Sequence, residues 1–322
     1  MDFFKQKIFN SGFDKLWSEI FKFQVKNNKV YSNYLKNLNL DVEKISNSNQ
    51  LVFLPVEFFK NQIITTLNDK SFDFCFESSS TTGKGVSKHF VSDIEFYKLT
   101  TQKCLEYFYG DIKNFNFRFL LPSYSERKNS SLIYMSDFFC KLSGNGGYYL
   151  NNYDDLINDL RKDKKNGKKS ILFGVSFALL DFAEKFEIDL SDVIVMETGG
   201  MKGRRKEITS FEIHDFLKKR FNLSNIHSEY GMTELFSQAY SKGNGKYECP
   251  PWMKVIITEL NDPFAIQTIG KTGIINVIDL ANIYSCCFIS TSDIGKLNDD
   301  GTFEILGRAD FSDIRGCSLL FE

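Results

Sequence analysis

Alternation of apolar and polar residues predicts where the first helices and strands of the chain lie. Residues 13–38 carry apolar side chains at helical spacing, which predicts one long helix. Residues 71–77, SFDFCFE, alternate in the way a half-buried strand does. Asp93 is predicted to cap a helix over residues 94–109, which Gly110 ends.

Between residues 117 and 231, short apolar runs alternate with segments of helical periodicity. The predicted strands are 117–122, 171–175, 192–200 and 226–231. The predicted helices are 133–142, 153–165, 176–187 and 211–221, the last beginning at Thr209 or Ser210, and the glycine-rich stretch 143–149 is predicted to be a loop. This alternation is typical of doubly wound sheets.

The last third of the chain changes to short β-type runs, at 252–260, 273–280, 285–291 and 301–306. These runs predict a small barrel or an edge sheet. At 322 residues the chain exceeds the usual limit of a single core. With no visible repeat or linker, we expect one compact α/β domain over residues 1–322, built from several lobes.

Charge and cysteine content exclude several function classes. The 40 basic and 41 acidic residues leave a net charge of −1, which argues against a nucleic-acid partner. Neither a signal peptide nor an apolar run of roughly 18 residues is visible, so we expect a cytoplasmic protein without a membrane span. The seven cysteines form no C-x-x-C pair, and only three histidines occur, so a zinc site is not expected.

Candidate chemistry begins with residues 76–88, FESSSTTGKGVSK, here called the hydroxyl-rich loop. Glycine lets backbone N–H groups approach an anion, hydroxyls donate hydrogen bonds, and lysine adds charge, a combination that suits a phosphate chain. A Walker loop is excluded, because its leading glycine would fall at Ser78 and Lys84 is followed by glycine. The residues expected to bind the β- and γ-phosphates are Ser79, Ser80, Thr81, Thr82, Gly83 and Lys84.

Three later segments follow this loop: YGMTE at 230–234, TSDIG at 291–295 and GRADFSDIRG at 307–316. In this order, the segments resemble the motifs of the adenylate-forming superfamily. Within it, the chain resembles the LuxE-type acyl-protein synthetases and their relatives among phenylacetate–CoA ligases. That narrower likeness lies in the segments 13–35, 53–60, 171–182 and 198–204.

The resemblance implies a fold and a nucleotide site. The fold would be the N-terminal domain of an adenylate-forming enzyme, with doubly wound α/β lobes and a small β-barrel-like lobe. The substrates would be ATP with Mg²⁺ and a fatty or other hydrophobic carboxylic acid. The implied contacts are Glu234 to Mg²⁺, Thr233 to the α-phosphate, Tyr230 and Gly231 to adenine, Asp293 and Arg308 to ribose, and backbone at Gly199 and Gly200 to the nucleotide.

Each of these residues also has a plainer interpretation. Glu234 would be an exposed carboxylate at the start of a helix, where the helix dipole stabilises it. Asp293 would be a turn aspartate before Gly295. Arg308 would form a surface ion pair with Asp310 or Asp313. Gly199 and Gly200 would form an ordinary left-handed turn.

Cys317, in the segment RGCSL, occupies the place of the acyl-accepting cysteine of the acyl-protein synthetases. A thiolate attacks a mixed anhydride readily, and Arg315 could lower the thiol pKa. Only twelve residues follow Asp310, so the mobile C-terminal domain of the superfamily and its lysine are expected to be absent. The candidate replacements for that lysine are Lys84, Lys88 and Lys202. The final acyl acceptor would be a partner reductase or carrier protein.

Three other functions remain open. The first is a ligase that forms acyl-CoA or acyl-carrier-protein without acylating itself. The second is an α/β-hydrolase, because GVSFA at 174–178 resembles a nucleophile elbow with Ser176 as nucleophile and His214 or His227 as base. The third is a binding or scaffold protein that retains the fold without catalysis.

Overall fold

The computed structural model describes residues 2–68, 71–79, 85–122, 127–150, 152–199 and 209–309. The chain divides into two compact units. Unit 1 is discontinuous and consists of Met1–Asp69 and Pro251–Glu322, whereas unit 2 is the single segment Lys70–Pro250. Each unit has its own sheet and its own buried side chains, so the two are described separately.

Unit 2 is built on a six-stranded sheet in the order β5-β4-β6-β7-β8-β9. Its strands are β4 (Phe115–Leu120), β5 (Gly146–Tyr148), β6 (Lys169–Val175), β7 (Val193–Thr198), β8 (His227–Tyr230) and β9 (Ala239–Ser241). All neighbours pair in parallel except β8 and β9, which are antiparallel. The predicted doubly wound organisation is therefore confirmed, although β5 lies in the stretch 143–149 that was expected to be a loop.

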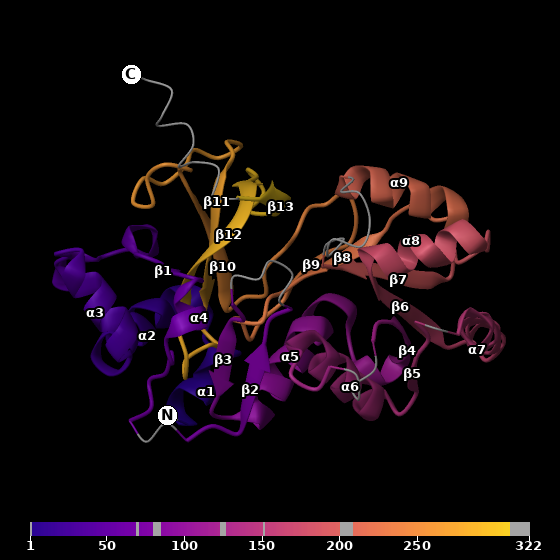
Figure 1. Cartoon of the computed structure of the whole chain (residues 1–322), viewed down its shortest axis with the longest axis horizontal. Helices are drawn as coiled ribbons and strands as arrows, with labels where there is room; N and C mark the ends of the chain where they lie inside the picture. The colour runs from indigo at the N-terminus through magenta and orange to yellow at the C-terminus, as the bar shows by residue number, and fades with distance from the viewer. Residues whose placement is uncertain are drawn as a thin grey trace. The chain divides into compact units, whose positions relative to one another are not determined.

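Helices connect these strands and cover the sheet. They are α5 (Ile94–Tyr109), α6 (Ser131–Ser143), α7 (Tyr153–Lys165), α8 (Ser176–Lys185) and α9 (Ser210–Phe221), with the 3₁₀ turn η3 (Ile112–Asn114) before β4. Figure 1 shows α8 and α9 on one face of the sheet and α5 and α6 on the other. Burial on both faces explains why β6 reads as a nearly continuous apolar run, whereas β4 also buries the polar side chains of Asn116 and Arg118.

Three predicted helix ends in unit 2 are confirmed. The Asp93 carboxylate accepts a hydrogen bond from the Phe96 backbone N–H at 2.8 Å, and Gly110 follows the last residue of α5 with a φ of 84°. Thr209 begins α9 with a capping box, in which its hydroxyl and the Glu212 carboxylate each accept a backbone N–H. Local sequence therefore determines where these helices start and stop.

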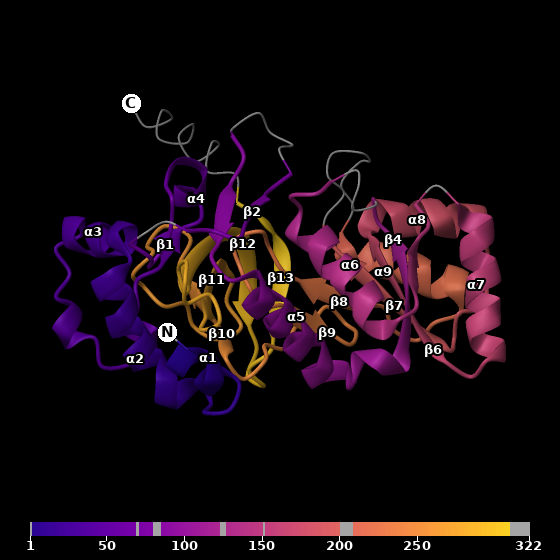
Figure 2. The same ribbon diagram turned by 90° about the horizontal axis from the view of Figure 1, so that it is seen from below.

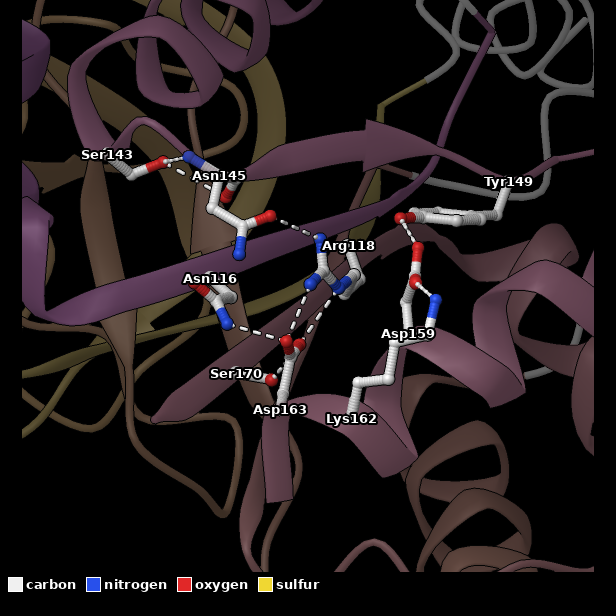
Figure 3. A network of polar contacts seen from close by, with 9 residues as sticks. All are labelled: Asn116, Arg118, Ser143, Asn145, Tyr149, Asp159, Lys162, Asp163 and Ser170. Carbon is white, nitrogen blue, oxygen red and sulfur yellow. Dashed lines mark hydrogen bonds and ion pairs between the residues drawn. The ribbon is translucent and has the colours of Figure 1, made fainter. Parts of the chain in front are cut away.

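A buried ion pair joins β4 to α7 (Figure 3). The Arg118 guanidinium donates to both carboxylate oxygens of Asp163, from Nε at 2.9 Å and from Nη2 at 2.7 Å. The amide of Asn116 and the hydroxyl of Ser170 donate to the same carboxylate, at 2.6 Å and 2.7 Å. Both charged side chains are only 4% exposed, so these four hydrogen bonds replace the water that each would otherwise bind.

Unit 1 contains a mostly antiparallel five-stranded sheet, as the β-type runs of the last third predict. The order is β1-β12-β11-β10, with β13 also paired to β12. Its strands are β1 (Leu54–Pro55), β10 (Met253–Thr258), β11 (Gly273–Asp279), β12 (Phe288–Leu297) and β13 (Phe303–Arg308). The only parallel pair among these strands is β1 with β12, which brings the N-terminal part of the chain into the sheet.

Four helices from the N-terminal part belong to the same unit. They are α1 (Asp2–Ile8), α2 (Phe13–Asn27), α3 (Lys29–Asn37) and α4 (Phe58–Asn61), with 3₁₀ turns η1 (Val42–Lys44) and η2 (Ser48–Gln50). Figure 2 shows α2 and α3 beside the strands of this sheet. Phe21 of α2 and Tyr31 of α3 both pack on Phe288 of β12, with ring centroids 5.8 and 5.6 Å apart.

The single helix predicted over 13–38 is wrong, because the chain breaks at Asn28. The Asn28 backbone is extended, and its side-chain oxygen accepts the Tyr31 N–H that starts α3. Its amide donates to the Ser285 carbonyl at 3.0 Å, and Gln24, one turn earlier, donates to the Ile283 carbonyl at 2.8 Å. Hydrogen bonds to a segment more than 250 residues away therefore set this break, which helical periodicity alone does not reveal.

Candidate nucleotide site

Two of the predicted motifs meet at the carboxyl edge of the unit 2 sheet. β7 and β8 are parallel neighbours, with Thr198 opposite Glu229. The residues that follow, Gly199 after β7 and Gly231 after β8, therefore leave the sheet side by side. Gly199 has a φ of 64°, a left-handed conformation that favours glycine. In open α/β sheets this edge is where ligands bind.

Buried carboxylates lie directly beneath that edge. Glu229 accepts a hydrogen bond from the Thr198 hydroxyl, and burial raises its pKa to about 7, with the nearby Glu197 carboxylate adding to the effect. A Cβ on Gly231 would come within 2.4 Å of the Glu229 carboxylate oxygen. The glycine of YGMTE thus leaves room for the carboxylate below it. Glu229 was not predicted from the sequence, although a glutamate within the predicted strand 226–231 was a signal that could have found it.

The YGMTE segment continues from β8 into irregular backbone. Tyr230 is 7% exposed, and its ring lies 6.1 Å from the ring of Tyr247. The backbone turns between Met232 and Leu235, whose N–H donates to the Met232 carbonyl at 3.1 Å. Thr233 is half-buried, and Glu234 is only 4% exposed.

Glu234 therefore contradicts its plainer interpretation. It lies in a turn rather than at a helix start, and it is buried rather than exposed. A buried carboxylate suits a cation-binding role, because buried charges are paired or bind metals. Within the described ranges no cluster of three His, Cys, Asp or Glu residues could hold a metal ion. Mg²⁺ commonly binds through one or two carboxylates together with substrate phosphates.

The hydroxyl-rich loop is carried by a separate two-stranded hairpin of unit 2. β2 (Phe74–Glu77) and β3 (Lys88–Val91) are antiparallel, and Ser78 closes their end by bonding twice to Ser87. Ser79 is half-buried just beyond this closure. The other predicted phosphate ligands, Ser80, Thr81, Thr82, Gly83 and Lys84, lie outside the described residues.

The two predicted ribose residues lie opposite each other in unit 1. Register pairs Asp293 of β12 with Arg308 of β13, and Arg308 Nε lies 3.9 Å from a carboxylate oxygen of Asp293. The Asp293 side chain is 19% exposed and that of Arg308 is 70% exposed, so both can reach a ligand. Asp293 is therefore a strand residue rather than a turn aspartate.

Gly295 fixes the register of this pair. A β-bulge separates Ile294 from Gly295, and a Cβ on Gly295 would lie 2.3 Å from the carbonyl oxygen of Glu304. Only glycine permits so close a backbone approach. The glycine of TSDIG is therefore required by strand pairing, and the aspartate two residues earlier is positioned by the same pairing.

Ser176 does not have the surroundings of a hydrolase nucleophile. It is 1% exposed at the start of α8, and its hydroxyl donates to the Glu197 carboxylate and to the Gly199 carbonyl. His214 lies 3.8 Å from Glu197 and 3.4 Å from the Ser228 hydroxyl, while His227 bonds the Tyr109 hydroxyl. Among the described contacts neither histidine reaches Ser176, so the geometry argues against a nucleophile elbow.

The remaining candidate residues are one described lysine and three residues outside the described ranges. Lys88 is exposed on β3. Gly200, Lys202 and Cys317 lie outside the described residues. Within the described part of the chain, no helix has the length and apolar character needed to cross a membrane.

Known proteins resemble the chain both in sequence and in fold. No family model matches the chain. The long-chain-fatty-acid–luciferin-component ligase of Vibrio harveyi is 20% identical over 323 residues, which cover 93% of this chain and 84% of the relative. The chain is therefore similar to a LuxE-type ligase of the adenylate-forming superfamily, which agrees with the predicted resemblance and with the prediction of a ligase.

Solved structures confirm the predicted fold class. ATP-bound MatB from Rhodopseudomonas palustris matches with a TM-score of 0.56 at 15% identity, over 73% of this chain and 47% of MatB. The O-succinylbenzoate coenzyme A synthetase of Bacillus subtilis, in complex with ATP and magnesium, matches with a TM-score of 0.52 at 16% identity, over 73% of this chain and 49% of that enzyme. The chain thus spans about half the length of the solved structures it matches.

Proposed function

We propose that the protein activates a fatty or other hydrophobic carboxylic acid with Mg–ATP, forming an acyl-adenylate and pyrophosphate. The observation that carries this proposal is the meeting of Gly199 and the YGMTE segment at the carboxyl edge of one parallel sheet, with the buried Glu234 close by in sequence. The likeness to a ligase named for long-chain fatty acids supports the choice of acid.

The chemistry explains why these residue types are needed. A carboxylate and a triphosphate repel each other, so the protein must offset charge and align the reacting groups. Glu234 would hold Mg²⁺, which offsets the charge on the phosphate oxygens. The Thr233 hydroxyl would donate to the α-phosphate, and Tyr230 and Gly231 would lie against adenine.

The remaining contacts would fix the triphosphate and the sugar. Ser79, Ser80, Thr81, Thr82, Gly83 and Lys84 would bind the β- and γ-phosphates. Asp293 would accept hydrogen bonds from the ribose hydroxyls, and Arg308 would donate to ribose or phosphate. These two side chains form an ion pair, with Arg308 Nε 3.9 Å from the Asp293 carboxylate.

In the second step of the proposal, the acyl group passes to a thiol, and Cys317 is the proposed acceptor. Its thiolate attacks the acyl carbonyl carbon, a C–S bond forms, the bond from that carbon to the AMP oxygen breaks, and AMP leaves with the electron pair. A partner reductase or carrier protein would then receive the acyl group. The alternative acceptor is a free thiol of coenzyme A or of a carrier, with no enzyme-bound thioester.

Pyrophosphate exchange into ATP tests the first step across a panel of carboxylic acids of different chain length. We expect exchange with hydrophobic acids; no exchange with any acid would refute the proposal.

Mass spectrometry of the protein after incubation with ATP and the best acid tests the second step. Cys317→Ser should retain exchange and lose the acyl adduct, whereas the control Cys249→Ser should retain both. An adduct that persists in Cys317→Ser would refute the assignment of the nucleophile.

A further inference from the structure

His89 links the hydroxyl-rich loop to the YGMTE segment. It lies on β3, two residues after Ser87, where the hairpin closes. Its Nδ1 is 2.8 Å from the carbonyl oxygen of Thr233, which lies 144 residues further along the chain. A carbonyl oxygen only accepts hydrogen bonds, so this contact requires the proton to be on Nδ1.

The acceptor is the peptide group between Thr233 and Glu234. This peptide is planar, so a hydrogen bond to its carbonyl also orients the N–H and Cα of Glu234. The segment around it is neither helix nor strand, so no regular ladder holds this carbonyl in place. A side-chain donor from another element therefore helps to set the position of both residues.

Aromatic packing leaves the imidazole little freedom. His89 is 0% exposed, and its ring lies 5.4 Å from that of Phe236. Phe236 packs against Tyr97 at 5.3 Å, and Tyr97 packs against Phe76 at 4.7 Å. Phe76 is the residue directly opposite His89 in the hairpin, so the four side chains form one continuous packing cluster. The donor is thus held by packing, as a positioning group must be.

We infer that His89 is a positioning residue, which holds the Thr233–Glu234 peptide in a fixed relation to the β2–β3 hairpin. This inference rests on the proposed function, in which Thr233 and Glu234 serve the α-phosphate and Mg²⁺. His89 acts through the position of these two residues and not by contact with ATP or the acid.

Two substitutions of His89 separate the effect of its hydrogen bond from the effect of its packing. His89→Leu keeps an apolar side chain of similar size and removes the donor. His89→Asn keeps an N–H group near the place of Nδ1, because the Asn side-chain nitrogen is the same number of bonds from the backbone. His227→Leu is the control, since it removes a hydrogen-bonded imidazole in the same unit, one that is half-buried and bonds Tyr109.

The measurements are the kcat and the KM for Mg–ATP in pyrophosphate exchange, and the thermal midpoint with and without Mg–ATP. We expect His89→Leu to lower kcat/KM for Mg–ATP by about 10- to 100-fold, the loss typical of a misplaced reacting group. It should also reduce the Mg–ATP-induced rise in midpoint, and His89→Asn should recover most of both losses. His227→Leu should lower the midpoint without Mg–ATP yet retain the KM.

The outcomes distinguish this inference from the proposed function. If the wild-type protein drives exchange and folded His89→Leu matches its kcat and KM, the inference is wrong and the proposed function stands. Equal losses in His89→Leu and His89→Asn would also overturn the inference. If the wild-type protein neither exchanges pyrophosphate nor gains stability from Mg–ATP, the proposed function fails and the inference fails with it. If Mg–ATP stabilises the wild-type protein without exchange, the midpoint shift alone decides for or against His89.

Discussion

Asparagine in place of Asp163 should strongly destabilise unit 2. The change keeps the shape of the side chain but leaves the Arg118 charge without its counter-ion at a site only 4% exposed. Loss of one partner of a buried ion pair typically costs about 3–5 kcal/mol in the free energy of unfolding. The new amide also turns an N–H group toward donors of Asn116, Arg118 or Ser170, which adds to the cost. Because whole domains are stable by about 5–15 kcal/mol, this loss is a large share of the total.

Urea unfolding followed by far-UV circular dichroism measures the effect, because both tryptophans, Trp17 and Trp252, lie in unit 1 and do not report on unit 2. The control is Asp159→Asn, the same substitution one turn earlier on α7 (Figure 3). The Asp159 side chain is 30% exposed, pairs with Lys162, which is 72% exposed, and accepts a hydrogen bond from the Tyr149 hydroxyl at 2.7 Å. The asparagine oxygen can still accept that hydrogen bond, so loss of the exposed ion pair should cost less than about 1 kcal/mol. If Asp163→Asn is no more destabilising than Asp159→Asn, the buried ion pair contributes no more to the free energy of unfolding than an exposed one.

Three further predictions concern the candidate site. Gly295→Ala should lower the thermal midpoint, because its Cβ would strike the Glu304 carbonyl, an overpacking worth about 1–3 kcal/mol; an unchanged midpoint would contradict the close approach. Asp293→Asn should raise the KM for ATP in pyrophosphate exchange by about tenfold or more, the worth of hydrogen bonds to a charged group, with a normal midpoint; an unchanged KM would remove Asp293 from the ribose site. Glu229 has a folded pKa of about 7, above its ordinary value, so the folded state binds the proton of Glu229 more tightly than the unfolded state does. The free energy of unfolding should therefore fall as pH rises from about 5 to 7. Glu229→Gln should flatten this pH dependence of the unfolding free energy, and equal slopes in both proteins would refute the assignment.

Local signals predicted most of unit 2. Asp93, Gly110 and Thr209 mark helix ends through contacts within a few residues, and these ends were confirmed. The apolar run of β6 reflects burial on both faces of a parallel sheet. By contrast, the short strand β5 lies in a glycine-rich stretch, and only its pairing with β4 makes it a strand.

Long-range contacts explain what sequence alone did not reveal. The break at Asn28 depends on the Ser285 carbonyl, and the setting of Asp293 depends on the register of β13. Motif order singled out Glu234 as a candidate, but its burial follows from the packing of the turn after β8 and has no local signature. His89 was missed for the same reason, since its partner Thr233 is distant in the chain.

The discontinuity of unit 1 has a consequence for biosynthesis. Strand β1 needs β12 as its parallel neighbour, and unit 2 is translated in full between them. At roughly 5–20 residues per second, the N-terminal helices emerge from the ribosome roughly 10–50 s before β12 is complete. During that interval the apolar faces of α2 and α3 have no sheet to cover, whereas unit 2 acquires all of its strands before β12 is complete. The nascent chain would therefore fold from the middle outward, and its first sixty or so residues are the part on which chaperones would act.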